Sequence, residues 1–215
     1  MEFHVTAIDL FPAWPAYRTM ICRAFLGVVV PGLLSACGLM PRHSDDGTAV
    51  ESPVDSQALD LRRVMGTWYV IGHVPYFTER GNVAAHDEYA PLPDGRIAVR
   101  YVYRTGFHSP VRTVDAIATV APGTGNRDWR LHFMRVVRAT QRIVEVAPDD
   151  SWALVISPDR DLAWIFARTP SMDAKTYQGL LHKLRGYHIN SDKVWRVAQT
   201  PSQVGGLGYE RPDKE

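Results

Sequence analysis

The chain has 215 residues, of which 46% are hydrophobic and 22% are charged, and its 24 Lys and Arg nearly balance its 23 Asp and Glu. These values exclude a largely disordered chain and a protein with several membrane spans. The net charge of +1 gives no electrostatic reason to expect a nucleic-acid partner. Two cysteines are too few for a disulfide-stapled scaffold, so the fold must depend on a hydrophobic core.

Residues 1–36 are predicted to be a secretory signal peptide. The apolar run at residues 24–34 is shorter than the ~20 residues that a membrane-spanning helix requires. Arg18 and Arg23 precede this run, and small residues follow it. A basic flank, a short apolar run and small residues are typical of an export signal. Translation from Met20 would give a more compact leader, so the true start stays open.

The apolar run is followed directly by Leu34-Ser35-Ala36-Cys37. This tetrapeptide resembles the lipobox of bacterial lipoproteins, in which the cysteine is acylated and becomes the first mature residue. The resemblance implies a lipid anchor on Cys37, with acyl chains such as palmitate, and Gly38 after the cysteine favours the outer membrane. Residues 37–58 are rich in Pro, Ser and Asp, which predicts a flexible tether behind the lipidated end.

The middle of the chain is predicted to be a meander of short strands. Hydrophobic residues alternate with polar ones, and turn residues such as Pro93-Asp94-Gly95 separate the runs. No helix-length pattern lies between the runs, which excludes a parallel α/β sheet. Eight short strands with tight connections favour an up-and-down β-barrel or a sandwich. The predicted strands are Thr67–Val74, Val83–Ala90, Arg96–Thr105, Val111–Val120, Asp128–Arg135, Gln141–Ala147, Ser151–Ser157 and Asp161–Arg168.

One helix is predicted after the strands, because apolar residues recur there at helical spacing, at Tyr177, Leu180, Leu181 and Leu184. We expect Thr169-Pro170-Ser171 to cap the helix, Asp173 to lie in its first turn and Gly186 to end it. A single apolar stripe predicts packing against the outside of a barrel. Residues 194–197 are predicted to form a short ninth strand. Residues 201–215 are predicted to be a C-terminal tail that frays into solvent.

Two segments of the chain carry a family resemblance. Gly66-Thr67-Trp68-Tyr69 resembles the Gly-x-Trp signature that opens a lipocalin barrel. Residues 158–170, Pro-Asp-Arg-Asp-Leu-Ala-Trp-Ile-Phe-Ala-Arg-Thr-Pro, resemble the last strand of the bacterial lipocalins, which are outer-membrane lipoproteins similar to apolipoprotein D. The resemblance covers Leu59 to Gln199. It implies an all-β fold over residues 59–200, an eight-stranded up-and-down antiparallel barrel with one C-terminal α-helix packed outside.

The resemblance also assigns residues to the fold and to a ligand pocket. Gly66, Trp68 and Arg168 would be fold residues, with the arginine lying across the Trp68 ring. The mouth of such a barrel is covered in the family by the first inter-strand loop, so Pro75–Asn82 is either a lid or a plain connection. By strand alternation, the inward-facing pocket residues would be Val99, Tyr101, Tyr103, Trp129, Leu131, Phe133, Trp152 and Leu154.

An apolar and aromatic wall of this kind suits a lipid tail. The resemblance implies fatty acids or lysophospholipids as ligands, stored or transported in the cell envelope. Arg135, Arg138 and Arg142 gather near one hairpin, where they would meet an anionic head group if the hairpin faces the mouth, or form a solvated basic rim. Val70 and Tyr101 stand where relatives often carry Glu and Asn, so the ligand's identity stays open.

The sequence offers little support for catalysis. Its histidines form no metal-ligand spacing, no serine lies in a Gly-x-Ser-x-Gly motif and the barrel has no cysteine. We therefore expect no enzyme, no catalytic residue, no metal and no cofactor. Two alternatives stay open, a structural or assembly lipoprotein with a filled barrel and a lipid- or carotenoid-modifying relative. The oligomeric state is open as well, and a homodimer is compatible with the sequence.

Overall fold

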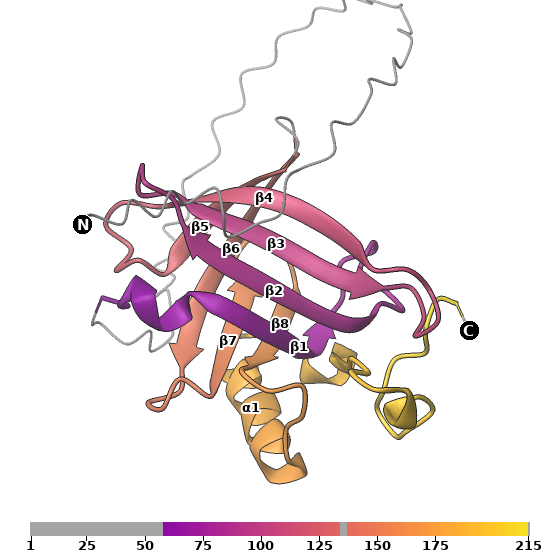
Figure 1. Ribbon diagram of the computed structural model, residues 1–215. Helices are drawn as coiled ribbons and strands as arrows, with labels where there is room; N and C mark the ends of the chain where they lie inside the picture. Colours follow the sequence, from indigo (N-terminus) through magenta and orange to yellow (C-terminus); the bar gives the residue numbers. More distant parts are fainter. Residues whose placement is uncertain (1–57, 134–136, 215) are drawn as a thin grey trace, which may run out of the picture.

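The computed structural model describes residues 58–133 and 137–214 (Figure 1). The predicted signal peptide, Cys37, nearly all of the predicted tether and Arg135 lie outside these residues. The strands are β1 (Gly66–Val74), β2 (Val83–Pro91), β3 (Ile97–Arg104), β4 (Arg112–Val120), β5 (Asp128–Phe133), β6 (Val137–Val146), β7 (Trp152–Ser157), β8 (Leu162–Ala167) and the short β9 (Trp195–Arg196). The helix α1 spans Ala174–Gly186, and single 3₁₀ turns lie at Leu61–Val64, Ser191–Lys193 and Pro201–Gln203.

The first eight strands form a closed antiparallel barrel (Figure 1). Each strand from β1 to β7 pairs with the next one along the chain, and β8 pairs with β1, which closes the sheet. The predicted up-and-down barrel is therefore confirmed. The strand bounds agree with the alternation pattern except at β6, which begins four residues earlier than Gln141. A bulge in β1 between Val70 and Gly72 shifts the register against β8 and changes which later residues face inward.

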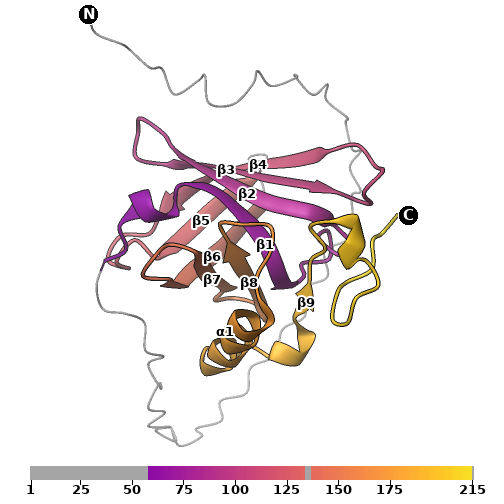
Figure 2. The ribbon, with the colours of Figure 1, turned by 60° about the horizontal axis from the view of Figure 1, so that its bottom comes forward.

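Helix α1 packs against the outside of the barrel, as predicted (Figure 2). Its buried residues Tyr177, Leu180 and Leu184 join a cluster with outward-facing residues of β1, β6, β7 and β8. The helix approaches β1 closely, because a Cβ atom at Gly72 would lie 2.9 Å from the Tyr177 hydroxyl oxygen. A glycine at this position therefore allows the helix to pack against the strand.

The N-cap of α1 differs from the prediction, whereas the helix ends at Gly186 as predicted. Asp173 is the N-cap, and its Oδ1 accepts a hydrogen bond from the Thr176 backbone N–H at 2.9 Å. Thr169 instead donates its hydroxyl to the Ser171 carbonyl, so residues 169–171 lie before the helix and do not cap it. At the other end, His188 takes the left-handed conformation with φ of 61°, a position that glycine more commonly fills.

The C-terminal residues pack on the barrel instead of fraying, so that part of the prediction is wrong. Glu210 N–H donates to the Arg196 carbonyl at 2.9 Å, Asp213 N–H to Gly81 at 3.0 Å and Lys214 N–H to Thr105 at 2.7 Å. We call residues 205–214 the C-terminal strap. The strap is held on the barrel by backbone hydrogen bonds. Because such bonds do not require a pattern of hydrophobic side chains, the sequence gives no sign of them.

Candidate functional site

The closed end of the barrel is filled by side chains. Trp68 and Trp129 are 1% and 0% exposed, and Tyr89 packs edge-on against Trp129 with ring centroids 5.3 Å apart. The space left at this end is only about 10 Å³, roughly room for one water molecule. It is lined by Val64, Trp68, Tyr89, Ile143, Ala153, Val155 and Phe166. A ligand of any size would have to displace these side chains to enter the closed end.

The 3₁₀ turn before β1 and the end of β8 seal this end through Trp68 and Arg168. Trp68 Nε1 donates to the Val64 carbonyl at 2.8 Å. The Arg168 guanidinium lies 3.6 Å from the centroid of the Trp68 ring and donates to the carbonyls of Thr67 at 2.9 Å and Arg63 at 2.7 Å. Gly66 has a φ of 92°, a left-handed conformation that favours glycine. In this geometry, Gly66, Trp68 and Arg168 all help to seal the closed end of the barrel.

Towards the open end, the inward-facing side chains stay accessible to solvent. Val114 lies opposite Tyr101 in the β3–β4 pairing, so it faces the interior, and yet it is 39% exposed. The other members are half-buried side chains that face the same space. We define the upper interior as Asp87, Tyr101, Tyr103, Val114, Phe133, Gln141 and Trp164. These exposures make it the candidate ligand site of the described residues.

The pocket residues expected from the sequence divide into three groups. Tyr101, Tyr103 and Phe133 lie in the upper interior. The remaining inward-facing residues are Val99, Trp129 and Leu131, which are buried in the packed closed half. The last two, Trp152 and Leu154, do not face the interior.

The inward orientation predicted for Trp152 and Leu154 is wrong. Leu154 is fully buried in the outer cluster with Leu180 and Leu184 of α1, and Trp152 packs against the same cluster. The inward face of β7 instead carries Ala153 and Val155. Both faces of this strand are apolar because one packs in the barrel and the other under the helix. Alternation of polar and apolar residues therefore cannot decide its orientation.

Ionisable and hydroxyl groups that were not predicted there line the upper interior. Tyr89 donates its hydroxyl to Asp87 Oδ2 at 2.9 Å, and burial raises the pKa of Asp87 to about 7. Tyr101 stacks on Tyr103 with ring centroids 5.0 Å apart and accepts a hydrogen bond from Asn82 Nδ2 at 3.2 Å. The interior therefore combines aromatic walls with a polar floor.

A second polar cluster lies on the β1 side of the open end. His73 is 1% exposed. It lies opposite the inward-facing Trp164 in the β1–β8 pairing, so it faces the interior as well. Its Nε2 lies 3.1 Å from Glu210 of the strap and its Nδ1 lies 3.6 Å from Glu79. Trp164 Nε1 also donates to Glu79, at 3.2 Å. Burial disfavours the imidazolium, but Glu210 and Glu79 outweigh it and raise the pKa of His73.

Glu210→Gln is expected to lower the pKa of His73 and to cost about 1–2 kcal/mol of stability at pH 6. Because folding raises the pKa of His73, the protonated imidazole stabilises the folded state. This stabilisation is fully present at pH values below the ordinary histidine pKa of about 6.5. That stabilisation is lost as the pH rises through the higher pKa of the folded state. Urea unfolding of the variant and the wild type should therefore differ more at pH 6 than at pH 9. An equal difference at both pH values would show that the charge on His73 is irrelevant.

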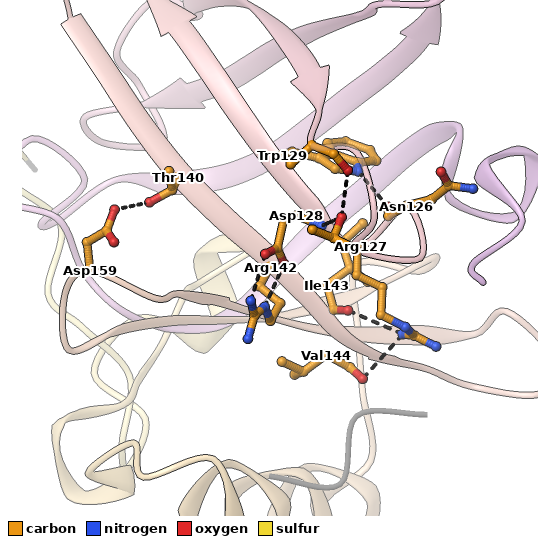
Figure 3. Close-up of polar contacts among 11 residues, drawn as sticks. Asn126, Arg127, Asp128, Trp129, Thr140, Arg142, Ile143, Val144 and Asp159 are labelled. Carbon is orange, nitrogen blue, oxygen red and sulfur yellow. Dashed lines mark hydrogen bonds and ion pairs between the residues drawn. The ribbon is translucent and has the colours of Figure 1, made fainter. Parts of the chain in front are cut away.

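Of the three arginines expected near the β5–β6 hairpin, Arg142 does not lie at the mouth. Arg142 lies near the closed end of β6, where Nε and Nη2 donate to Asp128 at 2.5 and 2.6 Å (Figure 3). It faces outward, because its neighbours Gln141 and Ile143 face the interior. Arg138 is exposed near the open end, and Arg135 lies outside the described residues. The hairpin therefore brings at most part of the cluster to the rim.

The loop Pro75–Asn82 lies at the open end and makes several polar contacts. Glu79 Oε2 accepts a hydrogen bond from the Tyr76 backbone N–H at 3.2 Å, and the Gly81 carbonyl accepts one from the strap. Arg160 of the β7–β8 turn lies 5.3 Å from the centroid of the Tyr76 ring. These contacts place the loop next to the upper interior, and its role as a lid stays a prediction.

Another surface feature lies outside the barrel. A groove of about 460 Å³ runs between β6 and the end of α1, lined by Glu145, His182, Lys183, Arg185, Gly186 and Tyr187. Lys183 and Tyr187 both bond to Glu145, at 2.7 and 3.0 Å. We therefore distinguish this outer groove from the upper interior.

Residues 58–133 and 137–214 hold neither a metal-binding cluster nor a membrane-spanning helix. No group of three or more His, Cys, Asp or Glu side chains in these ranges is arranged to hold a metal ion. None of the helices there is long and apolar enough to cross a membrane.

Comparison with known sequences supports one family. Residues 59–199 match the family model described as a lipocalin-like domain. Temperature-induced lipocalin-1 of Arabidopsis thaliana is 27% identical over 158 residues, which are 68% of this chain and 84% of the relative. Outer membrane lipoprotein Blc of Citrobacter freundii is 27% identical over 141 residues, 63% of this chain and 77% of the relative. The Blc of Escherichia coli strain K12 is 28% identical over 128 residues, 57% and 69% of the two chains.

Solved structures show the same fold at low sequence identity. Insecticyanin from the tobacco hornworm Manduca sexta aligns with a TM-score of 0.55 and 16% identity, over 74% of this chain and 92% of that one. Lobster apocrustacyanin A1 aligns with a TM-score of 0.54 and 11% identity, over 66% and 80% of the two chains.

Proposed function

The chain belongs to the lipocalin-like domain family, and from this premise we propose that it binds small hydrophobic molecules in the upper interior of its barrel. The observation that carries the proposal is the contrast between the two ends of the barrel. Apolar side chains such as Val114 and Phe133 face inward and stay accessible, whereas the closed end is packed. Burying the apolar part of a ligand against them removes apolar surface from water, which favours binding.

We further propose fatty acids or lysophospholipids as the ligands, with the tail inside and the anionic group at the rim. Arg112 supports this orientation, since it lies opposite Tyr103 at the open end and is exposed. Arg138 is exposed near the same end. Guanidinium groups bind carboxylates and phosphates through paired hydrogen bonds. Because the closed half is packed, we expect medium-length tails to fit better than long ones.

Native mass spectrometry of the full chain, titrated with fatty acids of eight to sixteen carbons and with lysophospholipid, tests this proposal. We expect one saturable adduct per chain, and the strongest binding at a medium tail length. The same spectra report whether the chain is a monomer or a homodimer. Absence of a saturable adduct with every lipid would contradict the proposal and favour a structural role for a filled barrel.

We also propose that Cys37 is acylated and holds the barrel at the bacterial outer membrane, where it would store or transport lipid. The tetrapeptide before Gly38 and the relatives named outer membrane lipoproteins support this proposal. Several acyl chains give a firm anchor, because each buried CH₂ contributes ~0.8 kcal/mol. No catalytic step is part of the proposed function.

Cys37→Ala tests the anchor. In a bacterial host supplied with an alkyne analogue of palmitate, we expect the wild-type chain to be labelled and to sediment with membranes. The variant should lose the label and should no longer sediment with membranes. Cys22→Ala is the matched control and should behave as the wild type does. Equal labelling of wild type and Cys37→Ala would contradict acylation at this residue.

A further inference from the structure

A carboxyl group that forms no ion pair among the described residues lies at the floor of the upper interior. Asp87 lies opposite Trp68 of β1 and Tyr101 of β3, so it faces into the barrel. Its hydrogen-bond partner is the Tyr89 hydroxyl at 2.9 Å. Among the described residues, no Lys, Arg or His side chain forms an ion pair with it. Even a half-buried carboxyl group without a cation nearby is costly for the fold, which calls for an explanation.

The groups around Asp87 do not compensate its charge. Glu79 from the β1–β2 loop adds a second acid, and it is the charged group that further raises the pKa of Asp87. His73 of β1 is held between Glu79 and Glu210, so its charge is already matched. The groups from β2 and β3 are the neutral phenols Tyr89 and Tyr101. The interior therefore attracts a cation and repels an anion at this depth.

Aromatic rings surround the same space. Tyr101 and Tyr103 stack on the β3 side, Phe133 lies on β5 and Trp164 on β8. Aromatic faces attract ammonium groups, and the attraction is stronger where the pair is shielded from water. From β6, Gln141 approaches the Tyr89 hydroxyl, but its Nε2 makes no hydrogen bond of normal geometry. Its amide can turn to offer the carbonyl oxygen to an N–H donor.

We propose that this floor is a subsite for a cationic amine carried by a small apolar body, which enters amine first and places its ammonium against Asp87 and Tyr89. The inference rests on the proposed function, namely that the upper interior takes small hydrophobic ligands. It adds a second ligand class with the opposite charge and the opposite orientation to the fatty acids proposed above. The carboxyl group, the absent counter-ion and the aromatic walls all favour the same class.

Octylamine, octanol and octanoate share one tail and differ in the polar group, so their binding to the full chain tests the subsite. We expect calorimetric titration at pH 8 to give octylamine at least tenfold higher affinity than octanoate. Asp87→Asn should weaken octylamine about tenfold and leave octanol within twofold. Lowering the pH through 7 should weaken octylamine, because Asp87 has a pKa of about 7 and becomes neutral.

Glu88→Gln is the matched control, since Glu88 follows Asp87 on β2 but faces outward beside Arg100. It should leave all three affinities unchanged. Tyr89→Phe is a second variant that removes only the hydroxyl, and it should weaken octylamine alone. If octanol still binds, either of two results would overturn the amine subsite. One is octanoate binding as tightly as octylamine, and the other is an unchanged octylamine affinity in Asp87→Asn. Failure of all three probes to bind would overturn the proposed function itself.

Discussion

Arg168→Ala should lower the free energy of unfolding by about 3 kcal/mol. The variant loses two charge-assisted hydrogen bonds, to the carbonyls of Thr67 and Arg63, and the contact of the guanidinium with the Trp68 ring. Both carbonyls would be left without this donor at the closed end of the barrel. Urea unfolding followed by circular dichroism measures the loss.

Arg168→Lys and Arg130→Ala serve as its comparisons. Lysine keeps the charge but lacks the planar fork that reaches two carbonyls, so about half of the loss is expected. Arg130 is exposed and faces outward on β5, so its replacement should change stability by less than about 0.5 kcal/mol. A loss below about 1 kcal/mol in Arg168→Ala would contradict the role assigned to Arg168 at the barrel floor.

Val114→Glu should weaken fatty-acid binding at least tenfold, a loss of about 1.4 kcal/mol or more. Val114 faces the upper interior and is 39% exposed, so the fold should tolerate a longer side chain there. The new carboxylate would occupy the space of the ligand tail and would have to lose water when the tail binds. Titration of the full chain with dodecanoate measures the change.

Thr113→Glu is the matched control for Val114→Glu. Thr113 precedes Val114 on β4, is exposed and lies opposite Val102 on the outward face. The control carries the same new charge a few ångströms away but outside the barrel. Equal affinity of the two variants for dodecanoate would place the ligand somewhere other than the upper interior.

The barrel could be predicted from the sequence because its local and long-range signals agree. Strands with one solvated face alternate cleanly, as in β3, where the inward Ile97 and Val99 alternate with Ala98 and Arg100. The pattern fails at β7, which is apolar on both faces because α1 covers its outer side. When both faces of a strand are apolar, the sequence pattern does not indicate which face points into the barrel.

The site was predicted only in part. Tyr101, Tyr103 and Phe133 follow from alternation, whereas Val114 and Trp164 were left out although they lie on predicted strands. Asp87 was also absent from the predicted pocket residues. The same alternation places Asp87 on the inward face with Ala85 and Tyr89, so the signal was present.

The polar cluster at His73 could not be predicted. Its inward orientation depends on the bulge in β1, and its partner Glu210 is 137 residues away in a segment expected to be free. Bulges and backbone-held straps arise from register and hydrogen bonding, and these leave little hydrophobic pattern in a sequence.

Photo-crosslinking with a medium-chain fatty acid that carries a diazirine near the end of its tail tests the central claim most directly. The full chain is irradiated with the probe, and mass spectrometry identifies the labelled residues. We expect saturable labelling of the upper interior, at Val114, Phe133 or their neighbours on β4 and β5. Labelling confined to the outer groove at His182 and Tyr187, or labelling that does not saturate, would contradict it.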